Sequence, residues 1–188
     1  MNPALRASAA HVFVDDLHSP SLSADDEHHL FRVMRLRSGE LVTISDGHGG
    51  WRSTVVEDHA LAPIGEAVSE ASPPPITIAS AIPKGDRLEW MVQKLTELGV
   101  SDMVFVDCER SVVKWTSERG AQQLLRLTRV AREAAMQSRR VWLPALRGPF
   151  DYADVIALPG AVIADPDGGS LADLDNDPHS GRIVVIGP

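Results

Sequence analysis

The sequence contains one cysteine, Cys108, which excludes an internal disulfide and a zinc site built from several cysteines. No apolar run approaches the roughly 18 residues that a membrane-spanning helix needs. The opening residues, MNPALRASAA, also lack the long apolar stretch of a secretion signal. These absences lead us to expect a soluble, cytoplasmic protein without a membrane partner.

Positive charge is scarce overall, since the formal net charge is −8, but it is unevenly distributed. Residues 151–188 hold seven acidic residues against one arginine, whereas residues 110–147 hold nine lysines or arginines against two glutamates. Such asymmetry bears more on nucleic-acid contact than the overall sum does. Solvated helix faces would explain the basic stretch equally well. The hydrophobic share of 44% predicts a packed core rather than a disordered chain.

The central stretch, residues 76–115, has the pattern of a strand, a helix and a second strand. Apolar residues alternate from Ile76 towards Pro83, and Asp86 with Glu89 has the spacing of a helix-capping pair. A helical stripe of apolar residues then ends at a glycine suited to a left-handed cap: Leu88, Met91, Val92, Leu95 and Leu98, followed by Gly99. With a second strand over 104–106, this is a βαβ unit with parallel pairing. Ligands of such sheets sit beyond the carboxyl ends of the strands.

Residues 1–70 have the pattern of a small β-barrel. Candidate strands are residues 11–14, 41–45, 51–56 and 64–68, with a glycine-rich hairpin turn over 46–50. That turn lacks the Gly-Lys-Ser/Thr ending of a phosphate-binding loop. Residues 71–75 end in three prolines, which favour an extended linker, so we place a domain boundary there.

A basic segment, DDEHHLFRVMRLRSGE, interrupts the candidate strands. We expect a short helix in which Leu30, Val33, Met34 and Leu36 face inward and Arg32, Arg35 and Arg37 face outward. The adjacent His28 and His29 cannot converge on one metal ion from a helix, and we predict no metal site. The arginines are candidates for contact with phosphate groups.

A long helix is predicted over residues 117–138, with Leu124, Leu127 and Ala131 inward. Arg139 and Arg140 follow its end, where a cation is favoured by the helix dipole as well as by an RNA partner. Residues 155–156 fall in a further helix. Residues 161–164 and 183–186 are apolar strands, and the second delivers Gly187 and Pro188 at its carboxyl end.

The run IPKGDRLEWMVQKLTELGV followed by CERSVVKW resembles the ribosomal RNA small-subunit methyltransferase E family, a member of the SPOUT class of knotted methyltransferases. HHLFRVMRLRSGE, AREAAMQSRRVWLPAL and RIVVIGP extend the resemblance over both halves of the chain. It implies a PUA-like barrel over 1–70 that helps to hold RNA, and a parallel α/β SPOUT domain over 76–188. The implied activity is methylation of N3 of a uridine in 16S rRNA of the small ribosomal subunit by a homodimer, with S-adenosylmethionine as cofactor.

The resemblance also implies site residues, although it leaves the catalytic ones unknown. Those expected near the cofactor are Ala164, Asp165, Ile186, Gly187 and Pro188; those expected on RNA are Arg32, Arg35, Lys84, Arg132, Gln137, Arg139 and Arg140. Met136 stands where the family usually has an acid. In the family, a strand like RIVVIGP continues into a loop and a further segment that completes the trefoil knot, the cofactor pocket and the catalytic residues. We therefore expect this chain to be a fragment of a longer protein.

Two other functions fit parts of the sequence. A non-catalytic RNA-binding protein would use the barrel and the arginine-bearing helix, and lack of affinity for S-adenosylmethionine would distinguish it. An unrelated hydrolase would need a nucleophile such as Cys108, yet no Gly-x-Ser-x-Gly motif and no placed histidine accompany it. Asp165 and Asp167 are explained by turn formation in Asp-Pro-Asp-Gly-Gly without a catalytic role.

Overall fold

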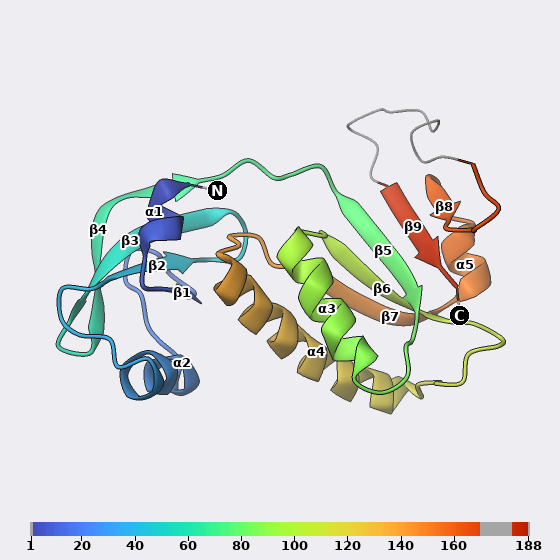
Figure 1. Cartoon of the computed structure of the whole chain (residues 1–188), viewed down its shortest axis with the longest axis horizontal. Helices are drawn as coiled ribbons and strands as arrows, with labels where there is room; N and C mark the ends of the chain where they lie inside the picture. Colours follow the sequence, from blue (N-terminus) through green and yellow to red (C-terminus); the bar gives the residue numbers. More distant parts are fainter. Residues whose placement is uncertain (1, 170–181, 188) are drawn as a thin grey trace. The chain divides into compact units, whose positions relative to one another are not determined.

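The computed structural model describes residues 2–169 and 182–187, which divide into two compact units (Figure 1). The first unit comprises Met1–Ser72 and Arg132–Leu143, and the second comprises Pro73–Ala131 and Pro144–Pro188. The first unit is therefore discontinuous in sequence. The long helix α4, Ser117–Ser138, begins in the second unit, and its last seven residues belong to the first.

The first unit is built on a four-stranded sheet with the order β1-β2-β3-β4. Strands β1 and β2 are parallel, and the other pairs are antiparallel. Its elements are α1 (Pro3–Ala7), β1 (Ala10–Phe13), α2 (Ala24–His28), the π-helix η1 (His29–Val33), β2 (Leu41–Ser45), β3 (Gly50–Glu57) and β4 (Ala60–Ser69). Val12, Val42 and Ile44 are fully buried in its core together with Leu30 from η1. The strands predicted for this part of the chain are confirmed.

The buried face of the short helical segment differs from the prediction. Val33 and Met34 are 59% and 40% exposed, so their predicted inward position is wrong. Leu30 and Phe31 are buried instead. The cause is the π-turn, in which the Met34 N–H donates to the carbonyl of His29 five residues earlier. A wider turn rotates the following residues away from the stripe that an α-helix would produce.

The second unit contains a five-stranded sheet with the order β7-β6-β5-β9-β8, in which every pairing is parallel. Its elements are β5 (Ile76–Ala81), α3 (Arg87–Leu98), β6 (Asp102–Asp107), β7 (Ala145–Asp151), α5 (Tyr152–Ile156), β8 (Ala161–Ile163) and β9 (Arg182–Ile186). The predicted βαβ unit is therefore confirmed.

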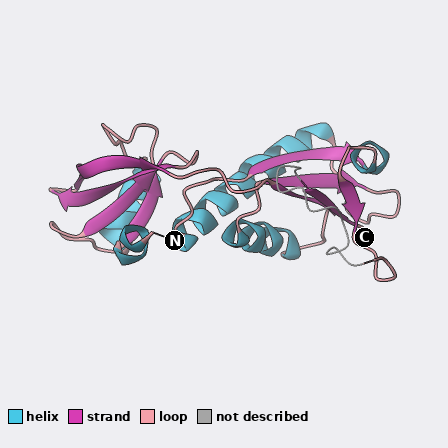
Figure 2. Ribbon diagram, turned by 90° about the horizontal axis from the view of Figure 1, so that it is seen from above, coloured by secondary structure: helices cyan, strands magenta, loops and turns pink. Residues whose placement is uncertain are grey.

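Figure 2 shows the strands of this sheet together with the helices that pack against it. Because side chains alternate across the sheet, each face has its own core. Met103 and Phe105 of β6 pack with α3 and α4 on one face, where Val92 and Leu127 are fully buried. Val106, on the opposite face, packs in a second cluster with residues of α5, β5 and β9. Burial on both faces explains why these strands are apolar runs without a polar side.

The two ends of α3 agree with the prediction only in part. Gly99 has the predicted left-handed conformation, with φ of 87°. The Val100 N–H donates to the carbonyl of Leu95, and Val100 is buried while Leu98 is 75% exposed, so the inward position predicted for Leu98 is wrong. Asp86 occupies the N-cap position, as predicted, but its side chain makes no cap bond, so the predicted capping pair does not form. Glu89 instead accepts hydrogen bonds from Arg126 of α4.

None of the helices within 2–169 and 182–187 combines the length and the apolar character that crossing a bilayer requires.

Candidate functional site

The first part of the candidate site is the carboxyl edge of the five-stranded sheet. Because β5, β8 and β9 are adjacent and parallel, their last residues reach the same edge. Ser80 pairs with Ile186, Ile163 pairs with Val185, and the Ala164 N–H donates to the carbonyl of Val185 over 2.8 Å. The residues that leave these strands are thus held together by the backbone ladder.

Four of the five residues predicted to bind the cofactor lie at this edge: Ala164, Asp165, Ile186 and Gly187. Pro188 lies outside the described residues. Ile186 is 43% exposed, and a Cβ added at Gly187 would meet no atom within 4 Å. The edge therefore offers an exposed apolar side chain, against which a nucleoside can pack. The role of these residues in cofactor binding stays a prediction.

The carboxylate of Asp165 closes a local turn. It accepts a hydrogen bond from the Asp167 N–H over 2.9 Å, and the Gly168 N–H donates to the Asp165 carbonyl over 3.0 Å. The turn predicted for Asp-Pro-Asp-Gly-Gly is confirmed. Cys108 follows β6 directly and is buried among Ala79, Val106 and other residues of the second core cluster, which is the environment of a packing cysteine.

The second part of the candidate site is the set of basic residues in the first unit. Arg132 is engaged within the fold: its guanidinium donates to the Asp26 carboxylate over 2.8 Å and to the Phe13 carbonyl over 2.9 Å. It also lies 5.5 Å from the centroid of the Phe13 ring. These contacts make Arg132 a residue that attaches the end of α4 to β1 and α2. Any additional contact with RNA stays a prediction.

Arg139 has a similar structural task. Its φ of 57° is left-handed, and the Arg140 N–H donates to the carbonyl of Ala135, as in a helix cap that glycine usually completes. This turn directs the Arg139 guanidinium to the carbonyls of Ser8 and Ala9, at 3.0 and 3.2 Å. Partial burial lowers the pKa of this guanidinium. The role of Arg139 on RNA is likewise a prediction.

The other predicted RNA contacts lie at the surface. Arg32, Arg35 and Gln137 are exposed in the first unit, and Arg35 has a left-handed backbone with φ of 57°. Lys84 is exposed in the second unit, just beyond the carboxyl end of β5. Arg140 is half-buried, and its carbonyl is hydrogen-bonded to His11.

A buried polar network lies beneath Arg139 and Arg140. His11 of β1 is 2% exposed; its Nδ1 lies 2.9 Å from the Thr43 hydroxyl and its Nε2 lies 3.0 Å from the Arg140 carbonyl. The pKa of His11 is lowered to about 4, mainly by burial and in lesser part by the charge of Arg139, while the hydrogen bond to the Arg140 carbonyl opposes the shift. The neutral imidazole therefore joins two strands to the segment that follows α4.

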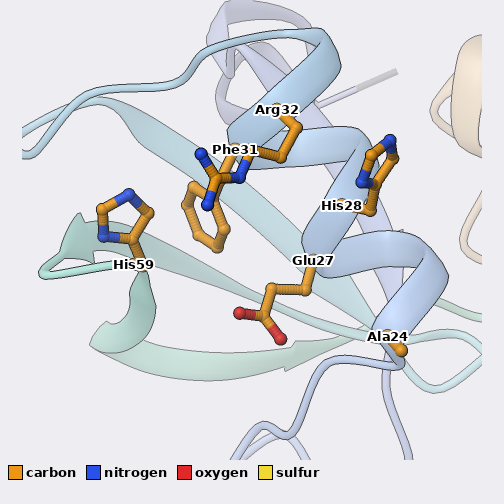
Figure 3. A pocket seen from close by; sticks show the side chains of 6 residues that line it. All are labelled: Ala24, Glu27, His28, Phe31, Arg32 and His59. Atoms are coloured by element: carbon orange, nitrogen blue, oxygen red, sulfur yellow. The ribbon is translucent and has the colours of Figure 1, made fainter.

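Sequence reasoning missed one feature of the first unit, a surface hollow of about 330 Å³ (Figure 3). We call it the His59 hollow; the residues that line it are Ala24, Glu27, His28, Phe31, Arg32 and His59. The rings of Phe31 and His59 meet edge to face, with centroids 5.1 Å apart. The only sequence signal for His59 was its place between Glu57 and Ala60, which pair in a hairpin with a two-residue turn.

Within the part of the chain that the structure describes, no group of three or more His, Cys, Asp or Glu side chains is arranged to hold a metal ion.

Residues 70–188 match the model of a family described as an RNA methyltransferase domain, and residues 22–59 match an RNA methyltransferase PUA domain. The chain is 35% identical over 140 residues to ribosomal RNA small subunit methyltransferase E of Synechocystis sp., covering 72% of this chain and 45% of that protein. It is 33% identical over 150 residues to the protein of the same name from Bacillus subtilis, and the match covers 76% of this chain and 58% of that protein.

A solved structure of a putative methyltransferase from Legionella pneumophila, in complex with bound S-adenosylmethionine, is similar at a TM-score of 0.79 and 26% identity. The likeness covers 95% of this chain and 79% of that one. These likenesses confirm the predicted family resemblance and the predicted fold class, a PUA-like unit and a SPOUT-type parallel α/β unit. The chain spans about half the length of the two curated relatives.

Proposed function

Because this chain belongs to the RNA methyltransferase domain family, we propose that it takes part in S-adenosylmethionine-dependent methylation of N3 of a uridine in 16S rRNA. The observation that carries this proposal is the match over residues 70–188, which contains the whole parallel sheet and its carboxyl edge. The names of the two curated relatives support the small ribosomal subunit as the substrate.

The cofactor side of the proposal uses the carboxyl edge of the sheet. Ala164, Asp165, Ile186 and Gly187 would hold S-adenosylmethionine, because ligands of parallel sheets bind beyond the carboxyl ends of the strands and Ile186 is exposed there. When bound, this cofactor supplies an electrophilic methyl group on a sulfonium. The Asp165 carboxylate keeps acceptor capacity beyond its bond to the Asp167 N–H, and a ligand hydroxyl can donate to it.

The RNA side of the proposal uses exposed cations of both units. Arg32 and Arg35 of the first unit and Lys84 of the second would hold phosphate groups, with Gln137 as an uncharged contact. Arg132, Arg139 and Arg140 would support this surface through the internal contacts described above. A cation held near the uridine would stabilise the anion that forms when N3 loses its proton, a contribution that is electrostatic and positional.

We further propose the domain assignment and the assembly of the protein. Residues 1–70 would act as the RNA-holding PUA-like part, residues 71–75 as a linker and residues 76–188 as part of the methyltransferase domain. The protein would act in the cytoplasm as a homodimer, where ribosomal RNA is its partner.

The test measures cofactor binding and methyl transfer separately. Calorimetric titration of S-adenosylmethionine is made into this chain and into any longer product of the same reading frame. The same proteins are incubated with small ribosomal subunits and cofactor labelled in the methyl group, and the modified nucleotide is located by mass spectrometry.

Methylation of N3 of one uridine in 16S rRNA is the expected result. Methyl transfer to another atom would overturn the N3 assignment alone. If neither this chain nor a longer product binds S-adenosylmethionine and both still bind RNA, the protein is a non-catalytic RNA-binding protein and the proposed enzyme function is wrong.

A further inference from the structure

The His59 hollow is lined by side chains of three chemical kinds. Phe31 and His59 provide rings, Arg32 and His28 provide donors, and Glu27 provides a carboxylate. Figure 3 draws the Arg32 guanidinium and the Glu27 carboxylate on opposite sides of the Phe31 ring. The hollow therefore combines an aromatic wall with a positive end and a negative end.

The backbone around the hollow is held in conformations that are uncommon for these residues. Asp58 and His59 both have positive φ, 45° and 63°, where a two-residue hairpin turn usually contains asparagine and glycine. An L-residue with a side chain is disfavoured in this region, so the turn holds a histidine at a cost in strain. On the facing side, the π-turn of η1 buries Phe31 and leaves Arg32 at the rim. Both irregularities bring side chains to one place.

The dimensions and the chemistry suit one nucleotide. A volume of about 330 Å³ is at the lower end of the range found for small-ligand sites, about 300–1,000 Å³. A base can stack on the exposed imidazole of His59, and a carboxylate such as Glu27 accepts hydrogen bonds from exocyclic amino groups of bases. The guanidinium of Arg32 pairs with phosphate through two parallel bonds. Because Glu27 repels phosphate, the phosphate belongs at the Arg32 end.

From these observations we infer that the His59 hollow binds a single unstacked nucleotide of RNA, with its base against His59 and Glu27 and its phosphate at Arg32. This inference rests on the proposed function for its ligand class, because it deepens the RNA-binding role of the first unit. It assigns the unit a pocket for one unpaired base in addition to its charged surface. The hollow belongs to the first unit, whereas the proposed cofactor edge belongs to the second.

The test uses the whole 188-residue chain and a fluorescent single-stranded RNA pool of mixed sequence, with affinity measured by anisotropy. His59→Gly removes the ring but keeps the turn, because glycine adopts positive φ freely. Arg32→Gln removes the guanidinium from an exposed site. Arg6→Gln is the control: Arg6 is exposed in the same unit, does not line the hollow and carries the same charge. Melting curves verify that each variant is folded.

We expect His59→Gly to bind single-stranded RNA at least about fivefold more weakly, the usual effect of losing one stacking partner. Arg32→Gln should weaken binding by a similar factor, and Arg6→Gln should weaken it less than twofold. A fully paired RNA of the same sequences should not distinguish His59→Gly from the unchanged chain, because its bases are not free to enter.

Equal affinity of His59→Gly and the unchanged chain for single strands would overturn the inference. An equal loss on paired RNA would also overturn it, because the contact would then be with the backbone only. Failure of the chain to bind any RNA would overturn it as well. The proposed methylation is judged independently by the cofactor titration and by methyl transfer.

Discussion

The guanidinium of Arg132 and the carboxylate of Asp26 are joined over 2.8 Å, although the residues are 106 positions apart in the sequence. Asp26 is nearly buried and also accepts from the hydroxyl of Ser23, which caps α2. The pair therefore fixes the end of α4 to the start of α2 with charge-assisted bonds that are largely shielded from water.

Asp26→Ala should lower the free energy of unfolding of the first unit by about 2 kcal/mol, because it leaves the half-buried Arg132 guanidinium without its carboxylate partner. Urea unfolding followed by circular dichroism measures the change. Arg129→Ala, at an exposed position three residues earlier on the same helix, is the matched control and should change the value by less than about 0.5 kcal/mol. Equal effects of the two variants would contradict a structural role for the pair.

His11 should make the stability of the first unit depend on pH. Its pKa is lowered from 6.5 to about 4 in the folded chain, mainly by burial. Above pH 6.5 the imidazole is neutral in both the folded and the unfolded chain, so protonation of His11 does not reduce the free energy of unfolding. As the pH falls from 6.5 towards about 4, the unfolded chain binds a proton that the folded chain excludes, and stability declines by up to ~3 kcal/mol.

Urea unfolding at several pH values between 4 and 7 measures this decline, and His11→Gln should flatten it while lowering stability at neutral pH. His18 is exposed, so His18→Gln should retain the decline. An unchanged slope in His11→Gln would show that another group is responsible.

Gly49 should tolerate no side chain. Its φ is +94°, and a Cβ there would overlap the ring of Trp142 and lie 2.8 Å from the carbonyl oxygen of Glu70. Gly49→Ala should therefore cost about 3 kcal/mol of unfolding free energy, from backbone strain and overpacking together. Gly39 has a similar φ of +92° with nothing within 4 Å of an added Cβ, so Gly39→Ala should cost only about 1 kcal/mol. Thermal melts that give equal losses would contradict the steric part of the argument.

Lys84 should contribute to RNA affinity through its charge alone. It is exposed at the carboxyl end of β5, so Lys84→Gln should leave the melting temperature unchanged. If Lys84 contacts one phosphate, the slope of log affinity for single-stranded RNA against log salt should fall in magnitude by about 0.7. Anisotropy titrations at four salt concentrations give the slope. An unchanged slope would show that Lys84 does not contact the RNA.

The sequence allowed prediction of the features that depend on local pattern. Alternating apolar residues located β5, a short apolar run located β6, and the βαβ spacing gave their parallel pairing. The meeting of Ala164 and Gly187 at one edge follows from the parallel strands that precede them. The family resemblance added the fold class.

Features that depend on distant partners could not be predicted. Asp86 and Glu89 have capping spacing, but Glu89 binds Arg126, which lies 37 residues further along. The inward positions expected for Val33 and Met34 assumed an α-helical period, whereas the segment forms a π-turn. The contact of Phe31 with His59 depends both on that turn and on a hairpin of two left-handed residues, neither of which has a clear local signal.

The discontinuity of the first unit has a consequence for synthesis on the ribosome. The four strands are complete once Ser69 has emerged, yet the acceptor for His11 and the donor for Asp26 lie beyond residue 131. Translation adds about 5–20 residues per second, so for seconds His11 has only its Thr43 partner and Asp26 lacks its cationic partner. A nascent chain stalled before residue 143 should therefore be cleaved by proteases in its first 72 residues, and a chain stalled well after it should resist.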